Sequence, residues 1–133
     1  MKVRVYLVED SSIMSDLLGT LVRANGATVV GRSDAAPTAI EDILLLRPDL
    51  VVIDIALRKG NGFDVLKALD DNRTGGKSPV RIVLTNYTLP AYREAARRWG
   101  AEYFFDKSNQ ILEMVRVLRM MSRNSKMANG GSN

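Results

Sequence analysis

The sequence predicts an α/β fold in which helices cover both faces of a doubly wound parallel sheet. Five short apolar segments, typical of buried strands, alternate with five segments whose apolar residues recur every three or four positions, as on one face of a helix. Strands joined through helices pair in parallel, and right-handed crossovers place the helices on both sides of the sheet. With 133 residues, the chain is long enough for one such domain and too short for two.

The strand segments consist mostly of aliphatic, β-branched and aromatic residues, the composition of strands that are buried on both faces. The fifth segment is the shortest of them. The predicted strands are Val3–Val8, Ala27–Gly31, Leu50–Ile53, Val80–Leu84 and Tyr103–Phe105.

Capping residues, glycine and proline indicate where the first two helices begin and end. Ser11 or Ser12 can cap the first helix with a side-chain oxygen, and Asn25-Gly26 ends it. The second helix begins near Pro37, whose fixed φ suits a first helical turn, and stops before Pro48, which cannot continue a helix.

The last three helices are recognised by their apolar stripes. The third follows a loop over residues 58–62, and the fourth runs from Pro90 to Gly100. The stripe of the fifth consists of Ile111, Met114, Val115, Leu118 and Met121. The periodicity is lost from Ser122, so we expect one domain over residues 1–122 and a flexible tail over residues 123–133.

The composition excludes several kinds of site and of protein. The chain has no cysteine and no histidine, which rules out disulfides, thiolate zinc sites, cysteine nucleophiles and a histidine general base. Its chemistry must come from carboxylates, hydroxyls, lysine and arginine, a set that suits a hard cation such as Mg²⁺. No apolar stretch approaches the ~20 residues of a membrane span. The first residues run directly into a strand without a secretory signal, so the expected compartment is the cytoplasm.

The net charge of +4 is unevenly distributed along the chain. Residues 1–64 contain nine acidic and seven basic residues, whereas residues 65–133 contain six acidic and twelve basic ones. The basic half is either a solvated surface or a docking surface for a protein or a second copy, and nucleic acid is the least favoured partner.

Polar residues stand where the predicted strands end. Glu9 and Asp10 follow the first strand, Asp54 follows the third, Thr85 the fourth, and Lys107 lies just after the fifth. In a parallel sheet these ends share one edge, where open α/β sheets bind their ligands, so we expect all five side chains to converge. Three carboxylates together predict a cation site, and their mutual repulsion should raise the pKa of at least one of them.

The chain resembles the receiver domains of two-component response regulators over residues 2–122. The matching segments are Leu7-Val8-Glu9-Asp10-Ser11, Val52-Ile53-Asp54 with Gly62 eight residues later, Ile82-Val83-Leu84-Thr85, and Gly100-Ala101 through Lys107. The resemblance implies a flavodoxin-like (βα)5 sheet with strand order 2-1-3-4-5. It also implies a signalling protein rather than an enzyme that acts on other molecules, since it would catalyse only its own phosphorylation and dephosphorylation.

The resemblance implies that Asp54 accepts a phosphoryl group from a phosphohistidine. That histidine must belong to a partner, a sensor histidine kinase or a histidine phosphotransfer protein, because this chain has none. The resemblance places Mg²⁺ on Asp10, Asp54 and the backbone carbonyl of Ala56, with Glu9 acting through a bound water.

The resemblance also implies roles for residues of the fourth and fifth strands. Lys107 would pair with Asp54 or with the phosphate, and the Thr85 hydroxyl would donate to a phosphoryl oxygen. Phe104 would be an aromatic switch that turns inward as Thr85 moves, although a buried strand aromatic explains this residue equally well. We then expect output through residues 90–123, by contact with a protein target or by formation of a homodimer.

Three residues depart from the pattern of the family. Arg58 stands where proline is common, which predicts a looser loop after Asp54. Asn86 stands where a small residue is usual, which predicts narrower access for a phosphoryl donor. Ser108 replaces a proline that the family joins to the lysine by a cis bond. Because a cis bond before a non-proline residue costs roughly 3–4 kcal/mol, the isomer of the Lys107–Ser108 bond is left open.

We expect a stand-alone receiver, with no output domain after the fifth helix. Four alternatives are weighed against it. One is a receiver cut from a longer regulator, with the tail as its linker. A silent interaction module with this fold would need neither the acids nor Thr85 and Lys107. A phosphatase of the haloacid dehalogenase type needs a second aspartate two residues after its nucleophile, where this chain has Ala56. A flavin carrier of similar topology would need hydroxyl-rich phosphate loops, which the sequence lacks.

Overall fold

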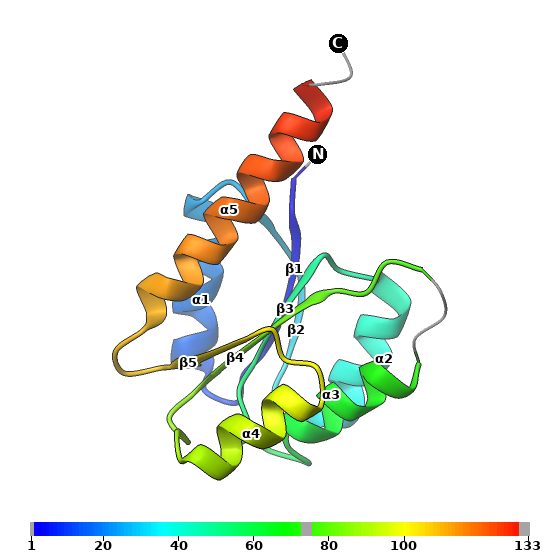
Figure 1. The fold of residues 1–133 in the computed structure, drawn as a ribbon, viewed down its shortest axis with the longest axis vertical. Coiled ribbons are helices and arrows are strands. Elements are labelled where there is room, and N and C mark those ends of the chain that lie inside the picture. The colour runs from blue at the N-terminus through cyan, green and yellow to red at the C-terminus, as the bar shows by residue number, and fades with distance from the viewer. Residues whose placement is uncertain (1, 73–75, 131–133) are drawn as a thin grey trace.

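A computed structural model describes residues 2–72 and 76–130, the last five of them by their backbone alone. Its strands are β1 (Arg4–Val8), β2 (Thr28–Ser33), β3 (Leu50–Ile53), β4 (Val80–Thr85) and β5 (Tyr103–Asp106). Its helices are α1 (Ser12–Ala24), α2 (Ala36–Leu46), α3 (Gly62–Asp71), α4 (Pro90–Arg98) and α5 (Ile111–Gly130). The strands form one parallel sheet in the order β2-β1-β3-β4-β5 (Figure 1). The predicted fold and strand order are therefore confirmed, and each strand lies within two residues of its predicted ends.

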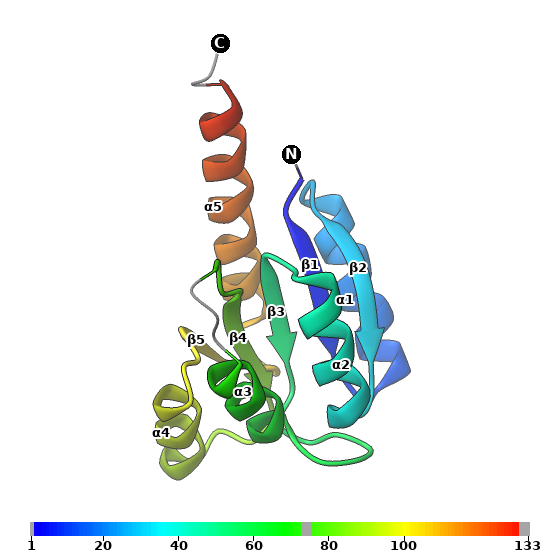
Figure 2. The ribbon, with the colours of Figure 1, turned by 90° about the vertical axis from the view of Figure 1, so that its right-hand side faces the viewer.

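The alternation of side chains along the strands divides the apolar core into two layers. In β1, Val5 and Leu7 belong to the layer that includes residues of α1 and α5, whereas Tyr6 and Val8 belong to the layer that includes residues of α2, α3 and α4. Figures 1 and 2 show these two groups of helices on opposite faces of the sheet. The strands are buried on both sides, which explains why their sequences are nearly continuous apolar runs.

Side-chain caps fix the starts of α1 and α3. The Ser11 hydroxyl accepts a hydrogen bond from the Met14 N–H at 3.2 Å, so Ser11 rather than Ser12 is the cap of α1. At α3, Asn61 and Asp64 form a capping box, in which each side chain accepts from the backbone N–H of the other residue. The loop predicted over residues 58–62 therefore ends one residue earlier, and Gly62 is already helical.

Helix α5 is longer than the sequence analysis predicts. It continues to Gly130, so the tail expected from residue 123 is helical as far as residue 130. The apolar stripe stops earlier because the helix passes the end of the sheet (Figure 1), where its residues have no core to cover. The extension contains no proline and no glycine before Gly130, which lets the helix propagate. Residues 131–133 lie outside the described part of the chain. Within that part, neither α5 nor any other helix is long and apolar enough to cross a membrane.

Helix α4 buries little of its surface. Ala96 is its one buried residue, and no side chain caps its first turn. At the other end, the fully buried Arg81 of β4 donates a hydrogen bond to the carbonyl of Trp99 at 3.3 Å. The Lys67 ammonium of α3 lies 5.4 Å from the centre of the Trp99 ring. The N-terminal end of α4, which faces the carboxyl edge of the sheet, is held by the half-buried Tyr92 ring, which stacks on Phe63 of α3 at 6.3 Å, and by the exposed side chain of Arg93.

Candidate functional site

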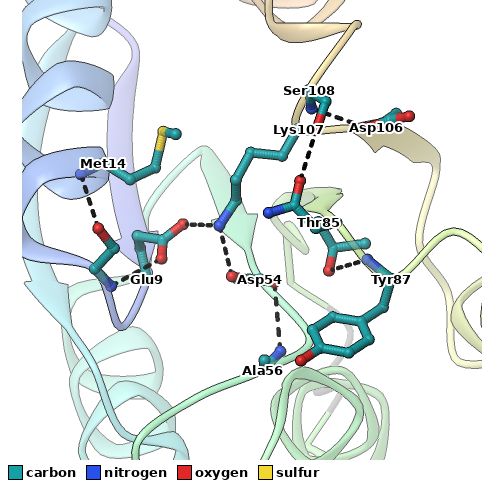
Figure 3. A network of polar contacts seen from close by, with 11 residues as sticks. Glu9, Met14, Asp54, Ala56, Thr85, Tyr87, Asp106, Lys107 and Ser108 are labelled. Carbon is teal, nitrogen blue, oxygen red and sulfur yellow. Dashed lines mark hydrogen bonds and ion pairs between the residues drawn. The ribbon is translucent and has the colours of Figure 1, made fainter.

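The carboxyl edge of the sheet brings the predicted site residues together. Val8 pairs with Ile53, so Glu9 and Asp54 leave neighbouring strands side by side. Thr85 ends the next strand, and its carbonyl accepts a hydrogen bond from the Lys107 N–H at 2.9 Å. Figure 3 shows the side chains of Glu9, Asp54, Thr85 and Lys107 close to one another at this edge. The predicted convergence is present, while the chemical role of each residue stays a prediction.

Three carboxylates form an acidic cluster at this edge. Glu9, Asp10 and Asp54 each offer an oxygen within 4.8 Å of the others; Glu9 and Asp54 are buried and Asp10 is exposed. Backbone hydrogen bonds hold the two buried acids: the Glu9 N–H donates to the Ser33 carbonyl at 3.0 Å, and the Asp54 N–H donates to the Val8 carbonyl at 2.9 Å. Three carboxylate oxygens at this separation fit a hard divalent cation such as Mg²⁺.

Steric crowding explains why the residue eight positions after Asp54 is glycine, Gly62. A Cβ atom at Gly62 would lie 2.5 Å from the Asp54 carbonyl oxygen and 2.9 Å from the Ile55 Cα. The Gly62 N–H also donates to the Ile55 carbonyl at 2.8 Å. The first turn of α3 therefore packs directly on the backbone beside Asp54, and any side chain at residue 62 would displace it.

The Lys107 ammonium joins two of the acids. It donates to Glu9 Oε1 at 2.6 Å and to Asp54 Oδ2 at 2.7 Å, and all three side chains are buried (Figure 3). The described peptide bonds are all trans, including the bond between Lys107 and Ser108. A turn around Asp106 shapes this loop instead of a proline, since the Asp106 carboxylate accepts from the Ser108 N–H at 2.8 Å. Lys107 therefore reaches the two carboxylates although the peptide bond that follows it is trans.

Burial and pairing shift the pKa values of two of these groups. Burial raises the pKa of Glu9, and the hydrogen bonds from Lys107 and from the Ser11 N–H offset only part of the rise. At Lys107, burial lowers the pKa, but the hydrogen bonds to Asp54 and Glu9 outweigh it, so the pKa lies above its ordinary value. One ammonium is shared between two carboxylates, so the negative charge of Glu9 is only partly compensated. The predicted rise in a carboxylate pKa is present, with burial rather than repulsion as its main cause.

The hydroxyl of Thr85 is fully buried beside the loop that leads to α4. It accepts a hydrogen bond from the Tyr87 N–H at 3.2 Å. The Tyr87 ring points toward the loop that carries Ala56 (Figure 3), and it meets the Tyr92 ring edge-on at 6.0 Å. The Ala56 N–H donates to Asp54 Oδ1 at 3.3 Å. The aromatic ring therefore lies at the side of the pocket where the loops after β3 and β4 meet.

Phe104 contacts α4 through a cation. The guanidinium carbon of Arg93 lies 4.6 Å from the centre of the half-buried Phe104 ring, within the range of a cation–π interaction. The residue at the predicted switch position is therefore neither freely exposed nor a simple core residue. It links β5 to α4, in which only Ala96 is buried.

The loop after Asp54 is not loosened by Arg58, so that prediction is wrong. The Arg58 N–H donates to the Asp34 carbonyl at 2.9 Å, a bond that proline could not make. The Arg58 guanidinium donates to Asp34 Oδ2 at 2.9 Å and lowers the pKa of that carboxyl group. The Lys59 carbonyl accepts from the Ala36 N–H at 2.9 Å. Three hydrogen bonds thus tie this loop to the segment after β2.

Two contacts that involve residues departing from the family's pattern have no signal in the sequence. The Ser108 hydroxyl donates to Asn86 Oδ1 at 3.1 Å across 22 residues, and Arg58 contacts Asp34 across 24. No local pattern marks such pairs, because neither partner lies within a helical turn or a strand period of the other. Only the three-dimensional arrangement reveals them.

Comparison with known proteins places the chain among response regulators. The family model of the response regulator receiver domain matches residues 5–119. The uncharacterized transcriptional regulatory protein YvfU of Bacillus subtilis is 30% identical over 118 residues, which cover 88% of this chain and 58% of that protein. An uncharacterized 14.6 kDa protein of Leptolyngbya boryana is 30% identical over 118 residues, 86% of each chain. The chain spans only about 58% and 55% of the length of YvfU and of PdtaR from Mycobacterium tuberculosis.

Solved structures share the fold. The response regulator domain of Thermotoga maritima CheB matches with a TM-score of 0.78 and 24% identity, over 93% of this chain and 96% of that chain. A DNA-binding response regulator of the LuxR family from Staphylococcus aureus matches with a TM-score of 0.80 and 20% identity, over 90% and 98%. At these identities the likeness is evidence for the fold alone. Together with the family match over residues 5–119, it leads to one conclusion: this chain belongs to the response regulator receiver domain family.

Proposed function

We propose that this chain is a phosphorylatable receiver, in which Asp54 accepts a phosphoryl group from a phosphohistidine of a sensor histidine kinase or a phosphotransfer protein, in a Mg²⁺-dependent reaction. The observation that carries the proposal is the Lys107 ammonium, which is buried between Asp54 and Glu9 at 2.7 and 2.6 Å. Burying charged groups is unfavourable, so a silent interaction module would have no reason to keep this arrangement beside the third acid, Asp10.

In the proposed reaction, a carboxylate oxygen of Asp54 attacks phosphorus. A new P–O bond forms as the P–N bond breaks, and its electron pair goes to the imidazole nitrogen of the partner. Attack brings a carboxylate toward a negatively charged phosphoryl group, and Mg²⁺, when bound, would neutralise part of that charge. Glu9, Asp10 and Asp54 fit this ion by their clustered oxygens, and the backbone carbonyl of Ala56 is the proposed additional ligand.

Lys107 and Thr85 are proposed to stabilise the transferred group. The Lys107 ammonium stays charged because its pKa is raised. Its flexible stem can move the charge from Asp54 Oδ2 to a phosphoryl oxygen. The Thr85 oxygen accepts from the Tyr87 N–H, and its hydroxyl hydrogen is suited to donate to a phosphoryl oxygen. Such a donation would pull on the loop that leads to α4.

We propose that output runs through residues 90–123, either to a protein target or to a second copy of the chain. Two contacts support this placement: Thr85 holds the backbone of Tyr87 at 3.2 Å, and Phe104 contacts Arg93 of α4 at 4.6 Å. A movement of Thr85 would therefore reach α4 from the loop before it and from the strand after it. Only Ala96 of this helix is buried, which makes α4 the element that we expect to respond.

The central test is phosphorylation by acetyl phosphate with Mg²⁺, followed by intact mass measurement. We expect one added phosphoryl group on the wild type and none on Asp54→Asn. Asp71→Asn is a matched control, because it removes the exposed Asp71 carboxylate of α3, and it should be labelled like the wild type. An unlabelled wild type, or equal labelling of Asp54→Asn, would overturn the proposal.

The placement of the output surface has its own test. Amide hydrogen exchange and size-exclusion profiles are compared before and after phosphorylation. We expect the exchange changes to concentrate in residues 90–123, with a shift in elution volume if the target is a second copy. Changes confined to residues 11–45 would contradict this placement while leaving the chemistry of Asp54 untouched.

A further inference from the structure

One face of α3 lies against α4 (Figures 1 and 2). Three side chains of this face recur at intervals of four and three residues, which places them on one side of the helix. We call them the α3 stripe: Phe63, Lys67 and Asp70. The Phe63 ring stacks on the Tyr92 ring of α4, with the ring centres 6.3 Å apart and the planes inclined by 14°. The α3 stripe therefore contacts α4 near the start of that helix.

The other two members of the α3 stripe reach the end of α4. The Lys67 ammonium lies 5.4 Å from the centre of the Trp99 ring, within the range of a cation–π interaction. Asp70 Oδ1 lies 3.9 Å from the Arg81 guanidinium, which donates to the Trp99 carbonyl at 3.3 Å. Trp99 is the C-cap of α4. Directly or through Arg81, the stripe thus contacts both ends of a helix in which only Ala96 is buried.

Helix α3 is the more firmly held member of this pair. Its first residue, Gly62, packs on the backbone beside Asp54, where a Cβ atom would lie 2.5 Å from the Asp54 carbonyl oxygen. A capping box closes its first turn, and Val65, Leu66 and Leu69 are buried. A movement of α4 alone would therefore leave α3 in place and would weaken the contacts that α4 makes with the stripe.

The Tyr92 ring also contacts the loop that is proposed to respond to phosphorylation. It meets the Tyr87 ring edge-on at 6.0 Å, and the Tyr87 N–H donates to the Thr85 hydroxyl oxygen at 3.2 Å. A displacement of Thr85 would reach Tyr92 through Tyr87, while Phe63 holds the same ring from α3. Because aromatic pairs have preferred geometries, a shift of the Tyr92 ring would weaken its stacking on Phe63.

We propose that the α3 stripe restrains α4 in the position seen in this structure, and that phosphorylation of Asp54 moves α4 against this restraint. This inference rests on the proposed function. The restraint and the phosphoryl group would favour different positions of α4. Because such coupling is reciprocal, a weaker restraint should raise the population of the moved position and, with it, the affinity for an analogue of the phosphoryl group.

The test replaces two residues of the stripe and measures two quantities. Phe63→Leu removes the stacked ring but keeps apolar bulk, and Lys67→Met removes the ammonium but keeps the stem. One readout is amide hydrogen exchange in α4 of the unphosphorylated protein, with α1 as the internal reference. The other is the dissociation constant of beryllofluoride, an analogue of the phosphoryl group, measured with Mg²⁺ by isothermal titration calorimetry.

We expect each variant to speed exchange in α4 and to lower the dissociation constant of beryllofluoride, both about two- to tenfold, the effect of losing one aromatic or cation–π contact. Exchange in α1 should stay the same. Lys77→Met is the matched control for Lys67→Met, because it removes an exposed ammonium that pairs with Asp49 instead of contacting α4. It should change neither quantity, and a change as large as that of Lys67→Met would overturn the inference.

The outcomes separate the restraint from the proposed function. If either stripe variant leaves exchange in α4 or the dissociation constant unchanged, or weakens binding, the restraint is refuted. Faster exchange in α1 as well as in α4, without tighter binding, means a loss of overall stability and also refutes it. In these cases the wild type still binds beryllofluoride, so the proposed function stands. A wild type that does not bind beryllofluoride with Mg²⁺ overturns the proposed function and the restraint with it.

Discussion

The site consists of two halves that are held in place in different ways. In the acidic half, backbone hydrogen bonds fix Glu9 and Asp54 to the neighbouring strands, with Glu9 bonded to Ser33 of β2 and Asp54 to Val8 of β1. In the other half, a backbone bond joins the Lys107 N–H to the Thr85 carbonyl, and the loops after β4 and β5 also depend on side chains: the Asp106 carboxylate, the Thr85 hydroxyl and the bond between Ser108 and Asn86. Backbone bonds in a buried sheet open rarely, whereas exposed side-chain bonds are weak and break easily.

This difference indicates which half of the site can move. The acidic half must keep its oxygens in place to hold a cation, and it lies between β1 and β3 in the middle of the sheet. The other half borders α4, in which only Ala96 is buried. A charge that arrives on Asp54 can therefore displace Thr85 and the loops beside α4 at a lower cost than it can displace the acids. We expect the acidic half to be the fixed part of the site and the other half to carry the signal.

The largest effect on stability is expected from replacing Lys107, where the two halves of the site meet. Without Mg²⁺ at neutral pH, Lys107→Ala leaves Glu9 and Asp54 buried without their ammonium, so the free energy of unfolding should fall by about 3 kcal/mol. Urea denaturation measures the loss. Lys59→Ala is the control, because it removes an exposed ammonium on a nearby loop.

The loss at Lys107 should depend on pH in a defined direction. The pKa of Glu9 is raised in the folded protein. The folded state therefore binds that proton more tightly than the unfolded state, and this contribution to stability is present below the ordinary pKa and lost as the pH rises through the raised one. Removing the ammonium raises the pKa of Glu9 further, so the deficit of Lys107→Ala should grow from acidic to neutral pH. A deficit that is constant over this range would contradict the pairing.

A smaller effect is expected from the cation itself. An ion that binds only the folded protein stabilises it by about 1.4 kcal/mol at ten times its dissociation constant. Thermal melts of the wild type should therefore shift upward when Mg²⁺ is added. In Asp10→Asn the shift should shrink, while the melt without Mg²⁺ stays nearly the same because Asp10 is exposed. Equal midpoints with and without Mg²⁺ would count against the cation site.

The lifetime of a phosphoryl group on Asp54 tests the half of the site that we expect to move, the half beside α4. Hydrolysis needs a water in line with phosphorus, and the Tyr87 ring lies at the side of the pocket near Ala56 (Figure 3). Ala56 has no polar group to position a water, and Tyr92 supports the Tyr87 ring at 6.0 Å. We expect slow self-dephosphorylation. Ala56→Asn, which adds one orienting group of ~1–2 kcal/mol, should speed phosphate release about tenfold.

Tyr87→Ala is the second variant for this prediction, because it removes the ring at the side of the pocket without adding a polar group. It should also speed phosphate release. Leu89→Ala offers a control, since Leu89 is an exposed apolar residue of the same loop. Should neither Ala56→Asn nor Tyr87→Ala speed release, shielding by the ring would be refuted.

The two halves also differ in how far the sequence predicts them. The strands and the acidic cluster follow from local signals, because an apolar run that ends in a carboxylate places that carboxylate at the edge of a parallel sheet. The bond between Asn86 and Ser108 and the helical continuation to Gly130 have no such signal. The first depends on two loops that meet only after folding, and the second on a helix that continues without an apolar face. The sequence therefore predicts where the reacting side chains lie better than it predicts the contacts between loops around them.

The smallest effect on the site is expected from replacing Arg58, and it tests whether backbone bonds hold the acidic half in place. Arg58→Ala removes the ion pair with Asp34 but keeps the bonds from the Arg58 N–H to Asp34 and from Ala36 to the Lys59 carbonyl. The pKa of Asp34 is lowered by Arg58 in the folded protein, so its contribution to stability is present above the ordinary pKa and lost as the pH falls through the lowered one. An NMR titration should show the Asp34 pKa rising toward its ordinary value in Arg58→Ala. Because backbone bonds hold this half, labelling of Asp54 should keep its wild-type rate. A large loss of labelling would mean that side chains, and not the backbone, hold the acidic half in place.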